Sequence, residues 1–518
     1  MFFSLKHFFC QTICNLKYLV KIHKKTKKTK RKLTFLHLYA TVLLAFCAKK
    51  GGAHIVKNFF KKEKFKMKKR ILAMLMACIM VLGLVACGST SSDDSANADG
   101  ETVLTFAYKQ VDNDPLEKFF ETYNIIEEFE AAHEGVKIEL KPVSSTEGDY
   151  GTLMALQLSS AKTAPDMFME DTYMTATDAA AGYLACLDDY VAAWDDWAHY
   201  LDGAKTAVQG VDGKTYGVPI STDSRGIYYN MAIFEEAGIE TPWQPTCWAD
   251  IIDAGKKVVA LNKGYEPFYL IVGGGNGEAI SMQTFEMLLY GTGDQLYEDG
   301  KWVIESQSIE DTFNFIADVY VNEKIGIDGG IAFAAGAGDK MAELMSQNQG
   351  AMFLSTCTDS AKWSATGSFP VEDVESKIGY AAMPTQNGGD PATVTMCGGW
   401  SWAISEFSEN KDLAFEFLAF CGNKENAARR SLLDGRMCPR DDAGEVEGYA
   451  DRAYVEEMTA FMANAYVRPK SEDYATITLK IQELVENVAS GAMSPADAAK
   501  EYSTQVINIV GEENTVAK

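Results

Sequence analysis

The chain has 518 residues, with 48 Lys and Arg against 72 Asp and Glu, and a formal net charge of −24. A hydrophobic content of 47% with 23% charged residues excludes a wholly disordered or collagen-like protein. The acidic balance argues against nucleic acid as a partner, because phosphate binding needs a basic surface. The length is sufficient to bury a large core.

The charge is divided very unevenly along the chain. Residues 1–66 hold 17 basic residues and a single acid, Glu63, and residues 67–86 add three more cations. Residues 87–518 hold 28 basic and 71 acidic residues, a net charge of −43. Because one folded unit rarely divides its charge so sharply, we expect the basic leader to be separate from the working protein.

The segment that begins at Met67 has the order of a bacterial signal peptide. A basic start at 68–70 precedes an apolar run at 71–84, which is shorter than the ~20 residues needed to span a bilayer. The run ends in the sequence Leu-Val-Ala-Cys, which resembles the lipobox of bacterial lipoproteins. We therefore predict a signal peptide at 67–86, a lipidated Cys87 and a flexible Gly/Ser/Asp-rich tether at 87–100.

A signal peptide should begin its chain, so residues 1–66 need an explanation. Our hypothesis is that they are a non-native upstream extension and that translation starts at Met67. The dipeptide Lys62-Glu63 can be encoded AAG-GAG, a ribosome-binding sequence, shortly before Met67. The alternative is a basic segment that touches the membrane, since residues 33–48 are apolar.

Beyond the tether, predicted strands and helices alternate, which favours an α/β fold. Helix starts are indicated by a capping-box-like pattern at Ser308 and by Pro495 at a first helical position. Helical stripes also cover 248–259 and 412–420. The expected strands lie at 102–106, 136–140, 166–169, 226–229, 269–272, 351–354 and 378–382.

The sequence lacks the usual signatures of catalysis and metal binding. Only His133 and His199 follow Cys87, and their spacing indicates no shared zinc. There is no nucleophile elbow and no phosphate-binding loop, and the Gly-rich run 273–277 is interpreted as a flexible loop. We therefore predict no catalytic residues, no metal and no cofactor. The six later cysteines are either disulfide-bonded or buried free thiols, and the sequence does not decide between these.

Several segments, in the correct order, resemble extracellular solute-binding proteins of family 1, the maltose-binding-protein-like receptors of bacterial ABC importers. They include a strand with a Tyr-Asn pair, an amphipathic segment, a proline turn and a Gly-Gly-Trp strand. These segments are 213–220, 226–238, 245–250, 349–353, 377–384, 398–404 and 410–418. The resemblance covers about residues 102–510.

The resemblance implies a two-lobed, periplasmic-binding-protein-like α/β fold with a multi-crossing hinge and a ligand cleft between the lobes. It places the crossings near 223–226, 376–379 and 433–440. Lobe I would comprise 101–223 plus 376–433, and lobe II 224–375 plus 434–518. Such receptors perform no chemistry on their solute, so the resemblance predicts that the protein is not an enzyme.

The resemblance also suggests polar ligand-binding residues. Asp223 takes the position of a hinge acid that binds ligand in related sugar receptors, and Arg225 lies two residues later. The alternative for these two is a structural salt bridge at the hinge. Glu170, Asp171 and Tyr173 follow a predicted strand whose carboxyl end opens on the cleft.

Sugars present apolar faces that stack on aromatic rings, so aromatic platforms are expected beside the polar groups. Tyr108 and Trp400 are the candidates, and each is equally well explained as a core residue. Relatives have a tryptophan shortly after the strand at 349–353, whereas this chain has Trp363 later. Arg436 flanks an expected crossing and completes the predicted ligand-binding set.

The resemblance thus predicts a receptor that binds a carbohydrate, of the oligosaccharide class, and delivers it to the permease of an ABC importer. The alternatives are a receptor for a polyamine, ferric ion or phosphate ester, or a surface lipoprotein glycosidase. The adjacent Tyr228 and Tyr229 resemble the tyrosine pairs of ferric receptors. We expect an exported monomer, held on the outer face of the cytoplasmic membrane through Cys87, with no nucleic-acid partner.

Overall fold

The computed structural model describes residues 101–110, 115–145 and 147–518. The chain divides into two units, Met1–Asp93 and Asp94–Lys518, and all described residues belong to the second. The predicted extension, signal peptide, lipidation at Cys87 and tether therefore lie outside the described residues. Within the described ranges, no helix is long and apolar enough to cross a membrane.

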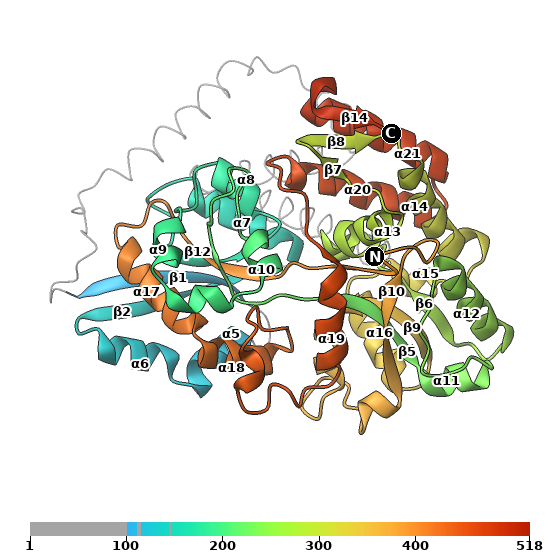
Figure 1. Ribbon diagram of the computed structural model, residues 1–518, viewed down its shortest axis with the longest axis horizontal. Helices are drawn as coiled ribbons and strands as arrows, with labels where there is room; N and C mark the ends of the chain where they lie inside the picture. The colour runs from blue at the N-terminus through green and yellow to red at the C-terminus, as the bar shows by residue number, and fades with distance from the viewer. Residues whose placement is uncertain (1–100, 111–114, 146) are drawn as a thin grey trace, which may run out of the picture. The chain divides into compact units, whose positions relative to one another are not determined.

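The sheet of lobe I has five strands in the order β2-β1-β3-β12-β4. They are β1 (Thr102–Gln110), β2 (Val136–Ser144), β3 (Met167–Asp171), β4 (Val218–Pro219) and β12 (Trp400–Ile404). β1 pairs in parallel with β2 and β3, whereas β12 is antiparallel to β3 and β4. Figure 1 shows the orange β12 in the same sheet as the blue β1, so a late segment of the chain completes lobe I.

Helices cover this sheet and form an aromatic core with it. Phe106 on β1 packs edge-on against Trp402 of β12 and Phe417 of a covering helix, with ring centroids 6.2 Å apart in each pair. The helices of this lobe are α5 (Pro115–Thr122), α6 (Ile125–Ala132), α7 (Glu147–Leu158), α8 (Thr175–Ala180), α9 (Asp188–Ala192), η1 (Asp195–His199), α10 (Asp202–Ala207), α17 (Lys411–Gly422), α18 (Lys424–Asp434) and η7 (Ala443–Glu445).

The sheet of lobe II has six strands in the order β13-β11-β10-β5-β9-β6. They are β5 (Arg225–Asn230), β6 (Glu266–Tyr269), β9 (Gly350–Thr356), β10 (Ile378–Pro384), β11 (Thr393–Met396) and β13 (Ala465–Tyr466). A small third sheet has the order β14-β8-β7. Its strands are β7 (Tyr297–Glu298), β8 (Lys301–Ile304) and β14 (Thr515–Ala517).

The helices of lobe II confirm two predicted starts, one of them shifted. α21 begins at Pro495, with the Ser494 hydroxyl accepting the Asp497 N–H. The other begins at Gln307, because the Ser306 hydroxyl accepts the Ser308 N–H. The helices are α11 (Met231–Glu236), α12 (Trp248–Ala260), η2 (Gly274–Asn276), η3 (Ile280–Glu286), α13 (Met287–Gly291), α14 (Gln307–Ala317), η4 (Asp318–Asn322), α15 (Gly329–Ala332), α16 (Ala337–Ser346), η5 (Cys357–Trp363), η6 (Val374–Ser376), α19 (Val455–Phe461), η8 (Met462–Asn464), α20 (Tyr474–Ala489), α21 (Pro495–Val510) and η9 (Glu512–Asn514).

One predicted strand is displaced from its expected position. The sequence predicts a strand at 269–272, but the ladder ends at Tyr269. The backbone of the next residue, Leu270, has a side chain as its hydrogen-bonding partner: the Tyr320 hydroxyl donates to the Leu270 carbonyl over 2.6 Å. A hydrogen bond from a distant side chain therefore takes the place of a strand partner at this position.

The chain crosses between the two large sheets in three places. Residues 220–224 connect β4 to β5, residues 397–399 connect β11 to β12, and residues 435–454 connect α18 to α19. The first and third crossings pair through an antiparallel bridge between Thr222 and Met437. The crossings therefore form one hydrogen-bonded unit between the lobes.

Two of the predicted lobe boundaries differ from this topology. The expected crossing at 376–379 is wrong, because β10 pairs with β5 over 378–382 and then with β11, and so stays in lobe II. Residues 376–396, which the sequence predicts in lobe I, therefore belong with lobe II. The start of the last segment assigned to lobe II instead packs on lobe I, since Leu201 N–H donates to Pro439 O and Cys438 joins a small core with α18.

All six cysteines of the described part of the chain are free. Four of them are buried, namely Cys357, Cys397, Cys421 and Cys438. The alternative of buried free thiols therefore fits the structure, and the disulfide alternative does not.

The packing of lobe I predicts a large difference between two leucines. Leu104 on β1 is fully buried, so Leu104→Ala should lower the free energy of unfolding by about 2–5 kcal/mol. Leu156 on α7 is 69% exposed, so Leu156→Ala should change it by less than about 0.5 kcal/mol. Urea unfolding of both variants measures the difference, and equal losses would contradict this packing.

Candidate functional site

A buried ion pair stands at the centre of the crossings. The Arg225 guanidinium donates to both carboxylate oxygens of Asp223, over 2.7 and 3.2 Å. The same carboxylate accepts the backbone N–H of Gly398, and Arg225 also donates to the Met396 carbonyl over 2.8 Å. Burial alone would raise the pKa of Asp223, but Arg225 outweighs it and holds the pKa below its usual value.

Three polar side chains of lobe I, those of Glu170, Asp171 and Tyr173, lie at or just beyond the end of β3. Asp171 accepts the backbone N–H of Tyr173, and burial raises the pKa of Asp171 to about 6 although the Arg468 guanidinium opposes this. Glu170 is 2% exposed. Burial raises its pKa, and the neighbouring Asp178 carboxylate raises it further.

Lobe II faces these residues with a charged cluster built around Arg468. The guanidinium donates to both oxygens of Glu278, over 2.8 and 2.7 Å. It also reaches lobe I, donating to the Thr172 hydroxyl over 3.2 Å and lying 3.9 Å from Asp171. Arg468 thus contacts both lobes.

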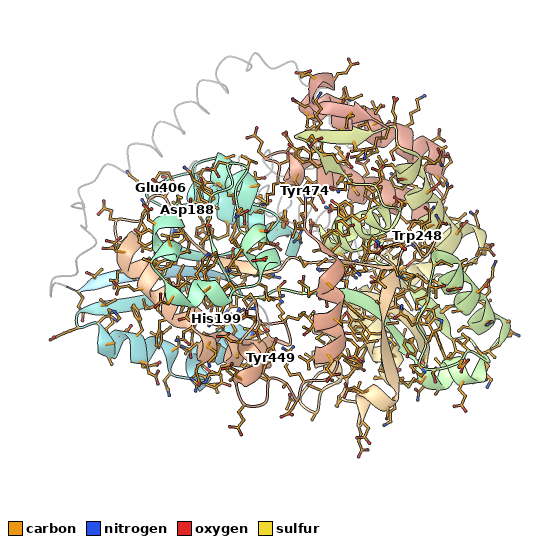
Figure 2. All side chains as sticks on the ribbon, viewed as in Figure 1. Asp188, His199, Trp248, Glu406, Tyr449 and Tyr474 are labelled. Atoms are coloured by element: carbon orange, nitrogen blue, oxygen red, sulfur yellow. The ribbon has the colours of Figure 1, made fainter. Side chains whose placement is uncertain are left out.

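Behind this arginine, a tyrosine joins two glutamates. The Tyr474 hydroxyl, at the start of α20 (Figure 2), lies 2.6 Å from oxygens of both Glu278 and Glu286. Burial and the neighbouring Glu278 raise the pKa of Glu286 to about 8. A hydroxyl carries one proton, so a Glu286 that keeps its own proton completes both hydrogen bonds.

The structure brings together four of the predicted site residues. Asp171, Tyr173, Asp223 and Arg225 surround the crossings, with Arg468 lying over the Tyr173 ring at 5.9 Å. The space between lobe I and the segment that carries Arg468 measures about 20 Å³, which is enough for one water molecule. The lobes are therefore in contact at this place.

The two predicted aromatic platforms, Trp400 and Tyr108, are buried and expose little ring surface to a ligand. Trp400 is 5% exposed, packs edge-on against Tyr150 and carries the Lys109 ammonium over its ring at 5.3 Å. Tyr108 is buried and its hydroxyl donates to Glu117. A sugar face on Trp400 would have to take the position that the ammonium occupies.

Two other predicted ligand residues, Trp363 and Arg436, lie in the core of lobe II and at the third crossing. Trp363 is fully buried in the core of lobe II, where its ring packs edge-on against Tyr228 and its N–H donates to the Ala342 carbonyl over 2.9 Å. It offers no surface to a ligand, so the structure argues against this candidate. Arg436 is half-buried at the third crossing, close enough for its charge to lower the pKa of Asp223.

Sequence reasoning missed Glu278, Glu286, Arg468 and Tyr474. Glu278 directly follows the Gly-rich run that was interpreted as a flexible loop, and 274–276 form a short 3-10 turn. Arg468 precedes a proline in a segment without helical or strand periodicity. The Arg-Pro dipeptide between two predicted elements is the only local signal that could have drawn attention to it.

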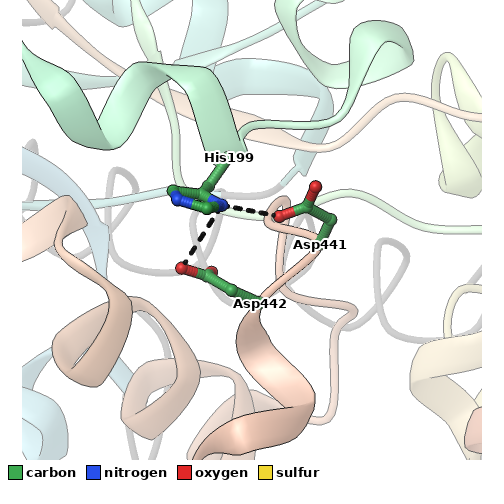
Figure 3. A group of neighbouring side chains, drawn as sticks. All are labelled: His199, Asp441 and Asp442. Carbon is green, nitrogen blue, oxygen red and sulfur yellow. Dashed lines mark hydrogen bonds and ion pairs between the residues drawn. The ribbon is translucent and has the colours of Figure 1, made fainter.

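Two further clusters of side chains lie outside the cleft. Figure 3 shows His199 between Asp441 and Asp442, with its Nδ1 3.0 Å from the former and 3.7 Å from the latter. Arg440 already binds both oxygens of Asp442, over 2.9 and 2.7 Å, and supplies the positive charge that a metal ion would bring. This cluster is a surface ion-pair network.

The second feature is a groove of about 560 Å³ on lobe I. α9 and α17 line it with Tyr190, Trp194 and Phe415 above a rim that includes Asp412 and Glu416. The Tyr190 hydroxyl donates to Asp412 over 2.6 Å, and its ring stacks on Phe415. The groove is formed by one lobe only, unlike the cluster at the crossings.

Two α/β lobes joined by three crossings, with converging polar groups between them, define a two-lobed binding protein. The chain belongs to the bacterial extracellular solute-binding protein family, whose model matches residues 116–428. Members of this family are binding proteins that work with ABC permeases outside the cytoplasm, in the periplasm or at the cell surface.

Similar proteins have been studied in several bacteria. The chain is 25% identical to the diacetylchitobiose binding protein DasA of Streptomyces coelicolor, over 84% of this chain and 97% of that protein. It is 22% identical to the maltodextrin-binding protein MdxE of Bacillus subtilis, over 86% and 97%. A solute-binding protein of Thermotoga lettingae bound to α-D-tagatose has the same fold, with a TM-score of 0.67, 22% identity, and coverage of 79% of this chain and all of that chain.

The buried Glu286 predicts a specific pH dependence of stability. Its pKa in the folded protein, about 8, lies above the ~4.3 of an unfolded chain, so its contribution is greatest below pH ~4 and declines as the pH rises to ~8. Glu286→Gln removes this titration while keeping a hydrogen-bonding partner for Tyr474. The variant should therefore gain stability relative to the wild type as the pH rises from about 5 to about 8.

Urea unfolding at several pH values measures this gain. Glu483→Gln, at an exposed position of α20, the helix that begins with Tyr474, is the matched control and should show no such trend. A stability difference for Glu286→Gln that does not change with pH would contradict the buried, protonated state.

Proposed function

We propose that the protein is an exported, lipid-anchored receptor that binds a carbohydrate in the cleft between the lobes. The proposed class of carbohydrate is an oligosaccharide. The receptor delivers this solute to the permease of an ABC importer. Cys87 is the proposed lipid attachment site, which holds the receptor on the outer face of the cytoplasmic membrane as a monomer. The tether raises the concentration of the receptor beside its permease.

The observation that carries this proposal is the set of hydrogen-bonding groups at the crossings, on a fold whose relatives bind sugars. Asp223 and Asp171 present carboxylate oxygens between the lobes, which suits the hydroxyl groups of a sugar. The printed names of relatives include binding proteins for diacetylchitobiose, arabinooligosaccharide and maltodextrin. The proposed ligand set is Asp171, Tyr173, Asp223 and Trp400, with Arg225 and Glu170 supporting them from behind.

The charge pattern favours a sugar over the anionic and metallic alternatives. Two arginines beside the cleft are paired with carboxylates of the protein, Arg225 with Asp223 and Arg468 with Glu278. A phosphate ester would therefore meet cations that are already neutralised. A ferric site is disfavoured because Tyr228 is fully buried and stacks on Tyr380 in the core.

The proposal includes no catalysis. A glycosidase needs two carboxyl groups on either side of the scissile bond, one of them able to donate a proton. Glu170 is 2% exposed and lies beside Asp178, whereas Asp171 and Glu278 both face Arg468. Arrangements of this kind hold a ligand and leave its bonds intact.

Calorimetry and thermal unfolding of the purified protein test the proposal. A panel of mono- and oligosaccharides, spermidine, ferric citrate and glycerol phosphate is titrated under one condition. We expect an oligosaccharide to bind and, at 100 times its Kd, to stabilise the fold by about 2.7 kcal/mol, which raises the Tm by several degrees. Asp223→Asn should weaken this binding at least ~10-fold, because an amide replaces an ionised acceptor.

Asp253→Asn, at an exposed position of α12, is the matched control and should bind like the wild type. The folding of each variant is checked by circular dichroism before binding is measured. Stabilisation by spermidine, iron or the phosphate ester with no response to any saccharide would overturn the choice of a sugar. Release of shorter sugars during incubation would overturn the assignment as a receptor.

A further inference from the structure

We propose that Arg468 is a positioning residue that couples solute binding in the cleft to the approach of the two lobes. This inference rests on the proposed receptor function and adds to it a residue for which sequence patterns gave no role. Arg468 lies between β13 and α20, and its guanidinium contacts both lobes and the crossing that joins them.

The anchor of this arginine is in lobe II. Two parallel hydrogen bonds to Glu278 fix the guanidinium plane, since a bidentate pair restricts rotation far more than a single contact. The Tyr474 hydroxyl holds the same carboxylate from the other side. The Arg468 side chain is 11% exposed, so its pairing is only weakly screened by water and salt.

Beyond its anchor, the guanidinium reaches across to lobe I. It donates to the Thr172 hydroxyl, and this hydroxyl donates in turn to the Gly399 carbonyl over 3.0 Å. A chain of hydrogen bonds therefore runs from Glu278 in lobe II to the end of β3 and the second crossing. Any separation of β3 from Arg468 must break it.

The second crossing is shaped to admit this arginine. A Cβ atom on Gly398 would lie 2.1 Å from the Arg468 Nη1 atom, so any side chain at residue 398 would have to displace the guanidinium. The N–H of Gly398 meanwhile donates to Asp223. Residue 398 is thus held between the hinge ion pair and the arginine, which places Arg468 against the segment that must flex when the lobes move.

Carboxylates on both lobes depend on this one cation. Asp171 of lobe I lies 3.9 Å from the guanidinium, and Glu278 of lobe II is bonded to it. Without the cation, these two carboxylates would repel each other across the cleft. A solute hydroxyl that binds Asp171 then lies beside Arg468, so recognition of the solute and contact between the lobes share the same groups.

The first test measures the distance between the lobes without any solute. Leu156 on α7 and Leu479 on α20 are 69% and 61% exposed, and dyes attached there through non-natural amino acids report the distance by single-molecule energy transfer. Arg468→Met should lengthen and broaden the distribution, and Arg468→Lys, which keeps the charge, should restore part of it. Lys500→Met, at an exposed position of α21 in lobe II, is the matched control and should leave the distribution unchanged.

The second test is a double-mutant cycle of Arg468→Met and Asp171→Asn, read as the Kd of the best saccharide. We expect Arg468→Met to weaken binding at least ~10-fold, and the two substitutions to be coupled by at least ~5-fold. The pH profile gives a readout that a merely structural role would not change. The titratable and charged groups that face the Asp171 carboxylate, and can therefore change its pKa, are Arg468, Glu278, Glu170, Tyr173 and Lys109.

In the wild type, affinity should fall as the pH is lowered through the pKa of Asp171, about 6. Because the guanidinium lowers that pKa, the fall should begin at a higher pH in Arg468→Met. Distance distributions and Kd values of Arg468→Met equal to those of the wild type would overturn the inference and leave the receptor function standing. A protein that binds no saccharide, yet whose lobes separate in Arg468→Met, would overturn the proposed function alone.

Discussion

The buried ion pair between Asp223 and Arg225 is the interaction on which the arrangement of the two lobes depends. Asp223 lies on the first crossing and accepts the Gly398 N–H of the second, while Thr222 beside it pairs with Met437 of the third. A buried pair is costly to break, since removing one partner leaves an uncompensated charge in a poorly solvated place. The crossings are therefore fixed at one point, and the lobes can move only by bending around it.

The same constraint shapes the chemistry between the lobes. Arg225 and Arg468 are each paired with a carboxylate of the protein, and the pKa values of Asp171 and Glu286 are raised because these acids are buried and lie near Glu278. Such a surface offers many hydrogen-bond acceptors and little net positive charge. It suits a neutral, hydroxyl-rich solute, which gains directed hydrogen bonds without introducing a new charge into a buried site.

Much of the fold could be predicted from sequence because its signals are local. The proline and serine at the start of α21, and the apolar stripes of α12 and α17, act within one or two helical turns. Errors arose where a distant residue decides the structure. Tyr320 ends the strand at Tyr269 from 51 positions away, and the pairing of β10 with β5 keeps 376–396 in lobe II.

The candidate site was predictable only where it lies on family motifs. Asp171, Tyr173, Asp223 and Arg225 stand at recognisable strand ends, and the structure brings them together. Arg468 is separated from Glu278 by 190 positions, so the sequence around either residue does not indicate that the two form an ion pair. Trp363 lies near a motif, yet it is buried in the core of lobe II. An aromatic residue beside a motif suits a hydrophobic core as well as a ligand platform, so the sequence could not distinguish the two.

A crystal structure of the protein with the tightest-binding oligosaccharide would show where the solute binds. We expect the sugar to lie between the lobes, with hydroxyl groups bonded to Asp171 and Asp223 and the Lys109 ammonium displaced from the Trp400 ring. A sugar bound instead in the groove of Tyr190, Trp194 and Phe415 on lobe I, with the cleft unchanged, would contradict this expectation.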